Sequence, residues 1–193
     1  YSDGANDSSV MVWRRCGGEA SRLWSFEWAR PLRPVRYLTL RLHEHRRTRL
    51  AGRILRPVAS AIDWTADRVI TSDRRKDERM LIRRAASAEE MFPLVQQVSS
   101  QSEVYPVYTL QSFRWLLETA AQARSFGVMR KVMAVDDEGQ PAGWFIYFVR
   151  PGGYARVLQM GAMWGQEPAV LAALFHDAVE QGAVAITGQF DSA

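Results

Sequence analysis

The order of apolar segments between Met80 and Gly188 constrains the fold of this chain most. A short apolar segment, 80–85, predicts a strand, and Ser87 with Glu90 three residues later is a capping-box signature for a helix. A second helix is expected over 110–123, strands over 128–135, 143–149 and 154–163, a helix over 168–181 and a last strand over 183–188. This order predicts an α/β (α+β) unit with an antiparallel meander of three strands.

The segment before this unit has a different character. Residues 71–79 include no apolar side chain and predict a solvated boundary. Upstream of it, helices are expected over 35–45 and 50–70, with a kink at Pro57, and a strand over 23–28 that Pro31 and Pro34 terminate. We therefore expect three parts, over 1–34, 35–78 and 79–193, of which the middle one is a basic helical connector.

Composition excludes several classes of protein. Among 193 residues there is a single cysteine, Cys16, and there are only three histidines, so neither a disulfide framework nor a metal site is expected. No apolar run approaches the ~20 residues that span a bilayer. We expect no membrane partner and a cytoplasmic protein.

The net charge of +4 comes mostly from arginines between Arg30 and Arg84. Acidic and apolar residues interrupt these arginines, which favours a helical connector with a solvated basic face over a nucleic-acid interface. No nucleic-acid partner is expected, although binding of nucleic acid or of an anionic membrane through this region is the competing interpretation.

The segment from Asn6 to Gly17 has a helix-start residue, an amphipathic stretch and a helix-stop glycine. Its Asn6, Trp13 and Gly17 have the spacing of the last helix of the GNAT superfamily of acyl-CoA-dependent N-acyltransferases, which this segment resembles. In that family the helix follows the core strands, whereas here it comes first, and the chain opens on Tyr1. The resemblance implies a fragment of a tandem GNAT protein, with the tail of one domain preceding another.

The segment 79–193 resembles the first two-thirds of a GNAT domain in the order of its elements. The local features are Gly143 at the start of the third strand and the pair Gly152-Gly153 before the fourth strand. The resemblance implies a mixed, mostly antiparallel central sheet flanked by helices. It also implies an N-acyltransferase, with acetyl as the expected acyl group, in which a small-molecule or peptide amine attacks acetyl-CoA or another acyl-CoA directly.

In the family, the fourth strand binds the pantetheine arm and polarises the thioester carbonyl. That role falls here on Met160, Gly161 and Ala162, with Gly165 in the phosphate loop that follows. The loop departs from the family pattern, because it has one glycine, an acidic Glu167 and a Pro168 that lacks an N–H donor. This departure leaves a second interpretation open, in which the unit is a non-catalytic GNAT-like module that has a structural or partner-binding role.

Four other residues are candidates for the site. Trp13 occupies the place of the tyrosine that protonates the leaving thiolate in many family members, but an indole cannot act as a general acid near neutral pH. Packing is therefore the competing role for Trp13. Asn6 is a candidate ligand of the acyl-CoA, with helix capping as its competing role. Tyr105 and Tyr108 lie between the two helices, a segment that shapes the acceptor pocket in the family. The sequence does not determine the acceptor, the catalytic base or the oligomeric state.

Overall fold

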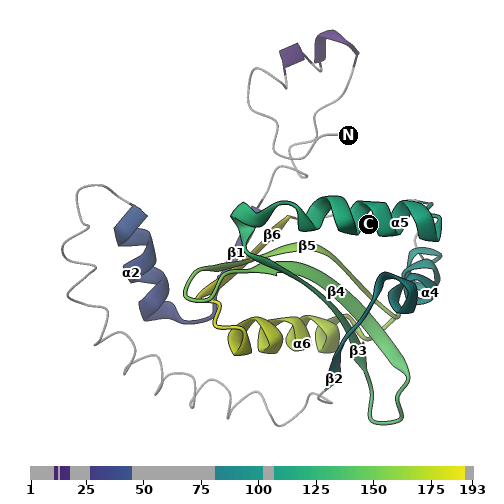
Figure 1. Ribbon diagram of the computed structural model, residues 1–193. Coiled ribbons are helices and arrows are strands. Elements are labelled where there is room, and N and C mark those ends of the chain that lie inside the picture. The colour runs from purple at the N-terminus through teal and green to yellow at the C-terminus, as the bar shows by residue number, and fades with distance from the viewer. Residues whose placement is uncertain (1–10, 13, 18–26, 45–80, 102–106, 190–193) are drawn as a thin grey trace.

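The protein is a mixed α/β fold with one six-stranded sheet between helices (Figure 1). A computed structural model describes residues 11–12, 14–17, 27–44, 81–101 and 107–189. The strands are β1 (Glu27–Pro31), β2 (Ile82–Ala85), β3 (Val128–Val135), β4 (Pro141–Val149), β5 (Tyr154–Ala162) and β6 (Ala185–Gln189). The helices are α2 (Pro34–Glu44), α4 (Ala88–Ser99), α5 (Leu110–Ala121) and α6 (Glu167–Glu180), with a 3-10 turn, η2, over Arg124–Phe126.

The strand order is β1-β6-β5-β4-β3-β2, and every neighbouring pair is antiparallel except β5 and β6. The predicted meander is β3-β4-β5, and the predicted mostly antiparallel sheet is confirmed. Strand β3 has the bounds expected from the sequence, 128–135. Strand β4 begins at Pro141, two residues before the expected start at Gly143.

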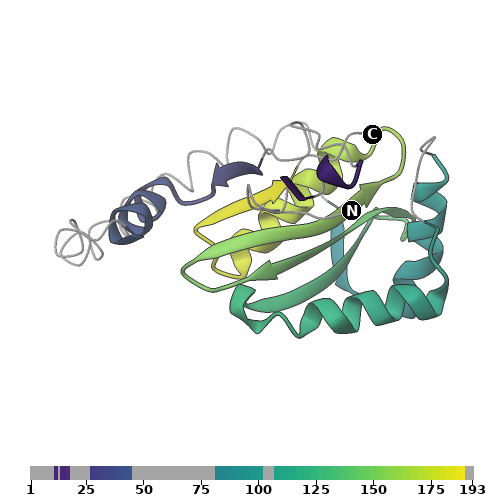
Figure 2. The ribbon, with the colours of Figure 1, turned by 90° about the horizontal axis from the view of Figure 1, so that it is seen from above.

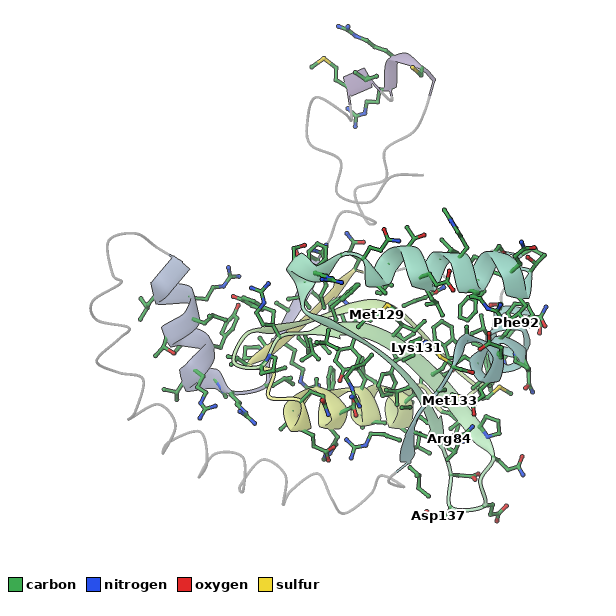
Figure 3. The ribbon with its side chains drawn as sticks, viewed as in Figure 1. Arg84, Phe92, Met129, Lys131, Met133 and Asp137 are labelled. Carbon is green, nitrogen blue, oxygen red and sulfur yellow. The ribbon has the colours of Figure 1, made fainter. Side chains whose placement is uncertain are left out.

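Helix α6 packs on one face of the sheet and α4 and α5 on the other (Figure 1). The two cores follow from the alternation of side chains along β4, where residues 142–149 are buried on both faces. Phe145 and Tyr147 belong to the α6 core, whereas Trp144 and Ile146 belong to the core under α4 and α5. Figure 3 shows Met129, Lys131 and Met133 following one another along β3, and both methionines pack in the second core.

Local signals explain the ends of several elements. The Ser87 side chain accepts a hydrogen bond from the Glu90 amide, and the Glu90 carboxylate accepts one from the Ser87 amide, so the predicted capping box is confirmed. Strand β1 ends at Pro31, three residues after the end expected for the strand over 23–28, and α2 begins at Pro34, one residue before its expected start. Gly17 has a φ of +82°, which suits the predicted helix stop.

Strand β1 lies far from β6 in the sequence but forms the edge of the same sheet. Glu27 pairs with Gln189 and Pro31 with Ala185, and the amides of Leu32 and Arg33 both donate to the Val184 carbonyl at 3.0 and 2.9 Å. From there α2 extends beyond the end of the sheet where β4 and β5 are joined (Figures 1 and 2). The predicted helix over 50–70 and the boundary over 71–79 lie outside the described residues, and the division into three parts stays a prediction.

Candidate functional site

Strands β5 and β6 run side by side only at their beginnings. Their parallel pairing joins Tyr154–Arg156 to Ala185–Thr187, whereas β5 continues to Ala162 and stays paired with β4 along that length. Beyond Arg156, the edge of β5 that faces β6 has no strand partner among the described residues. Because backbone N–H and C=O groups need hydrogen-bond partners, this edge can receive an extended ligand.

A β-bulge lies next to the point of separation. Ile146 pairs with Gln159 and Tyr147 with Val157, so Leu158 is the extra residue of β5. A bulge bends the strand that carries it and increases its twist. This bend, two residues after the last pair with β6, explains why β5 turns away from its neighbour there.

Gly161 allows β4, β5 and α4 to approach one another in the separated part of the sheet. A Cβ added to Gly161 would lie 2.9 Å from Val98 Cγ1 and 3.0 Å from Trp144 Nε1. Trp144 is only 2% exposed, and its Nε1 has no hydrogen-bond partner in the described part of the chain. A second glycine, Gly143, would place a Cβ 2.5 Å from the Gly161 carbonyl oxygen and 2.6 Å from Val170 Cγ2. The glycine at each of these positions is therefore a steric requirement.

The turn between β5 and α6 begins where the Met163 amide donates to the Ala142 carbonyl at 2.8 Å. Gly165 has a φ of +78°, and a Cβ there would meet no atom within 4 Å. Helix α6 begins at Glu167 without a side-chain cap, and Pro168 occupies its first turn. The Glu167 carboxylate complements the helix dipole at this position and would repel a second anion. Pro168 supplies no N–H donor, so this terminus also has fewer donors for an anion than an ordinary helix start.

The structure brings some of the predicted site residues together. Met160, Gly161 and Ala162 are consecutive on β5 at the separated edge, and Gly165 follows in the next turn. Tyr108 is half-buried, with its ring centroid 6.0 Å from that of Phe113, in the core that also includes Trp144. Three other predicted residues lie outside the described residues: Asn6, Trp13 and Tyr105. The roles of all of these residues stay predictions.

The sequence interpretation missed a buried polar network on the α6 side of the sheet. Arg130 Nε and Nη2 donate to Asp177 Oδ2 and Oδ1 at 2.9 and 3.1 Å, and the Tyr147 hydroxyl donates to Oδ2 as well. Burial raises the pKa of Tyr147 far above its ordinary value, and the hydrogen bond to Asp177 raises it further. One signal was available, because Asp177 is an acid within the apolar face of α6. That face also includes Val170, Ala173, Leu174 and Ala178.

Among the described residues, no group of three or more His, Cys, Asp or Glu side chains is arranged to hold a metal ion. No helix of that part of the chain combines the length and the apolar character needed to cross a membrane.

No protein-family model matches the sequence, and no curated protein matches it. Among solved structures, the chain is similar to a probable N-acyltransferase from Enterococcus faecalis, with 11% identity and a TM-score of 0.44 over 61% of this chain and 30% of that one. A GCN5-related N-acetyltransferase from Kribbella flavida has 16% identity and a TM-score of 0.40 over 57% and 26%. A glucosamine-6-phosphate N-acetyltransferase from Arabidopsis thaliana has 10% identity and a TM-score of 0.40 over 59% and 83%. The chain spans less than a third of the length of the first two, and at these identities the similarity concerns the fold alone.

Proposed function

We propose that the chain is part of a GNAT-type N-acyltransferase that transfers an acyl group, with acetyl the expected one, from acyl-CoA to an amine. The observation that carries this proposal is the separation of β5 from β6 after Arg156, next to the bulge at Leu158. An extended chain with amide groups of its own, such as the pantetheine arm, can hydrogen-bond along such an edge.

The donors at this edge would be the backbone amides of Met160 and Ala162, because the Met163 amide bonds to β4 and, two residues earlier, the Gly161 amide faces β4 as well. They would bind the thioester carbonyl oxygen and stabilise the negative charge that develops there when the amine attacks. Holding the amine and the thioester together supplies the rest of the acceleration, because the reaction becomes effectively unimolecular. We assign no side chain as the base.

The two ends of an acyl-CoA fit the described residues differently. The separated edge of β5 suits the pantetheine arm, whereas Glu167 and Pro168 suit the pyrophosphate poorly. We infer weak affinity for acyl-CoA at the start of α6, and binding that depends on β5. The acceptor, a small-molecule or peptide amine, would approach from the segment of Tyr105 and Tyr108. Asn6 and Trp13, in the remnant of a preceding GNAT domain, stay secondary candidates.

Calorimetric titration of the chain with acetyl-CoA, followed by assay of CoA thiol release with amine acceptors, tests this function. Gly161→Val, which would push β5 away from Trp144 and Val98, is expected to weaken acetyl-CoA binding at least tenfold. Gly153→Ala is the matched control, because its Cβ would meet only ordinary contacts of 3.4–3.5 Å at the far end of β5. Equal binding by both variants and the unaltered chain, or no binding by any of them, would contradict the proposal. Binding without transfer to any amine would favour the non-catalytic module.

A further inference from the structure

A groove of about 570 Å³ lies at the end of the sheet where β4 and β5 are joined. Its floor includes Arg156 and Thr187, which are paired with each other across β5 and β6. Their chain neighbours Ala155 and Ile186 belong to the core under α6, so Arg156 and Thr187 project from the opposite face of the sheet. The β4–β5 hairpin, η2, α2 and β1 form the walls.

Three arginines from separate elements line this groove: Arg41 of α2, Arg150 of the hairpin and Arg156 of β5. Each guanidinium is held by a neighbour. Arg150 Nη2 donates to the Ser125 carbonyl, and the Arg156 guanidinium carbon lies 4.9 Å from the centre of the Phe126 ring. Arg41 Nε donates to the Tyr37 hydroxyl at 3.1 Å. Because a guanidinium has five N–H donors, the contacts of Arg150 and Arg156 leave donors for a ligand.

The positive charge of the groove is poorly compensated. Elsewhere in the described residues, four arginines have a carboxylate partner within 4.0 Å: Arg83, Arg84, Arg114 and Arg130. Within the described part of the chain, neither Arg150 nor Arg156 has one. Glu27 is the one acidic residue among the described residues of the lining, so Arg150 and Arg156 outnumber it.

We propose that this groove binds the phosphate group of a ligand. Positioned guanidinium groups bind a phosphate with paired, charge-assisted hydrogen bonds, and Arg150 and Arg156, which have no carboxylate partner among the described residues, complement its negative charge. The groove lies at the start of β5, where β5 and β6 are still paired, whereas Met160–Ala162 lie near the end of β5. Phosphate binding in the groove therefore does not depend on acyl-CoA binding at Met160–Ala162. The phosphate belongs to a soluble phosphate ester or to the headgroup of a phospholipid.

Two probes test the groove on the full chain. Calorimetry with inorganic pyrophosphate represents a soluble ligand. Cosedimentation with vesicles of phosphatidylglycerol, compared with phosphatidylcholine, represents a lipid surface. The double variant Arg150→Gln/Arg156→Gln is expected to bind the preferred probe about tenfold more weakly. Glu27→Gln is expected to bind it about twofold more tightly, because the opposing charge is removed.

Arg114→Gln is the matched control, since it removes one exposed positive charge from α5, outside the groove lining, and is expected to leave binding unchanged. If loss of the Arg150 bond to Ser125 unfolds the double variant, Arg156→Gln alone, which breaks no hydrogen bond, is expected to weaken binding about threefold. Binding of either probe with this pattern supports the groove and identifies the source of the phosphate. Failure of the unaltered chain to bind either probe, or an equal loss in Arg114→Gln, would overturn the proposal.

Discussion

Arg130 of β3 and Asp177 of α6 form a two-pronged ion pair, with Nε–Oδ2 and Nη2–Oδ1 distances of 2.9 and 3.1 Å. Asp177 is 3% exposed, and its carboxylate also accepts a hydrogen bond from the Tyr147 hydroxyl of β4. The pair therefore joins α6 to two neighbouring strands of the sheet on the side opposite α4 and α5.

Asp177→Asn is expected to lower the free energy of unfolding by about 2–4 kcal/mol, because it leaves the Arg130 charge without its partner in a half-buried place. Chemical denaturation measures this change. Asp137→Asn, in the exposed turn between β3 and β4, is the control and should change the free energy by less than about 0.5 kcal/mol. Equal effects of the two substitutions would show that the ion pair does not stabilise the fold.

The raised pKa of Tyr147 predicts that the folded protein loses stability at high pH. Its pKa is raised in the folded state, by burial first and then by Asp177, whereas the unfolded chain releases this proton near pH 10. Since the folded pKa is the higher one, the contribution of Tyr147 is fully present below pH 10 and is lost as the pH rises further.

Tyr147→Phe is expected to cost about 1–2 kcal/mol at pH 7, because Asp177 loses a donor. Above pH 10 the difference between the two proteins should shrink by up to about 1.4 kcal/mol per pH unit. Unfolding free energies measured from pH 7 to 11 test this, and a constant difference across that range would refute the raised pKa.

Trp28 of β1 packs directly on Gly188 of β6, where an added Cβ would lie 2.6 Å from the indole Cζ2. Gly188→Val is therefore expected to displace β1 and to lower the free energy of unfolding by about 1–3 kcal/mol. Thr187→Val, one residue away, is the control. In a double-mutant cycle with Trp28→Ala, the two losses should not add, because either substitution removes the same contact. Additive losses would contradict this packing.

Glu167 places a negative charge at the start of α6, where the pyrophosphate of an acyl-CoA would approach in the proposed function. Glu167→Gln is expected to tighten acetyl-CoA binding about two- to fivefold at low salt, with a smaller gain at high salt. Calorimetric titration with acetyl-CoA at two ionic strengths measures this change in affinity. Glu138→Gln, in the β3–β4 turn, should have no effect, and weaker binding by Glu167→Gln would place the pyrophosphate elsewhere.

The parts of the fold that depend on neighbouring residues could be predicted from the sequence. The capping box of Ser87 and Glu90, the strand over 128–135 and the hairpin at Gly152 depend on local propensity and turn chemistry. The pairing of β1 with β6 could not be predicted, because more than 150 residues separate Glu27 from Gln189 and the alternation of a strand does not specify its partner.

The features of the candidate site that depend on contacts between distant segments could not be predicted either. The family resemblance assigns Met160–Ala162 to the acyl-CoA site; these residues follow the last pair of β5 with β6, and their role stays a prediction. The bulge at Leu158 and the unpartnered Trp144 Nε1 arise from register and packing between strands, which no single segment encodes. The three arginines of the groove likewise come from separate parts of the chain: α2, the β4–β5 hairpin and β5.

Amide hydrogen exchange of β5 with and without acetyl-CoA tests the central claim most directly. If the separated edge binds the acyl-CoA arm, exchange at Met160 and Ala162, whose amides face away from β4, should slow about tenfold or more on addition of saturating acetyl-CoA. The amides of β2, on the far edge of the sheet, should be unaffected. Unchanged exchange at Met160 and Ala162 at a concentration where calorimetry shows acetyl-CoA bound would contradict the account.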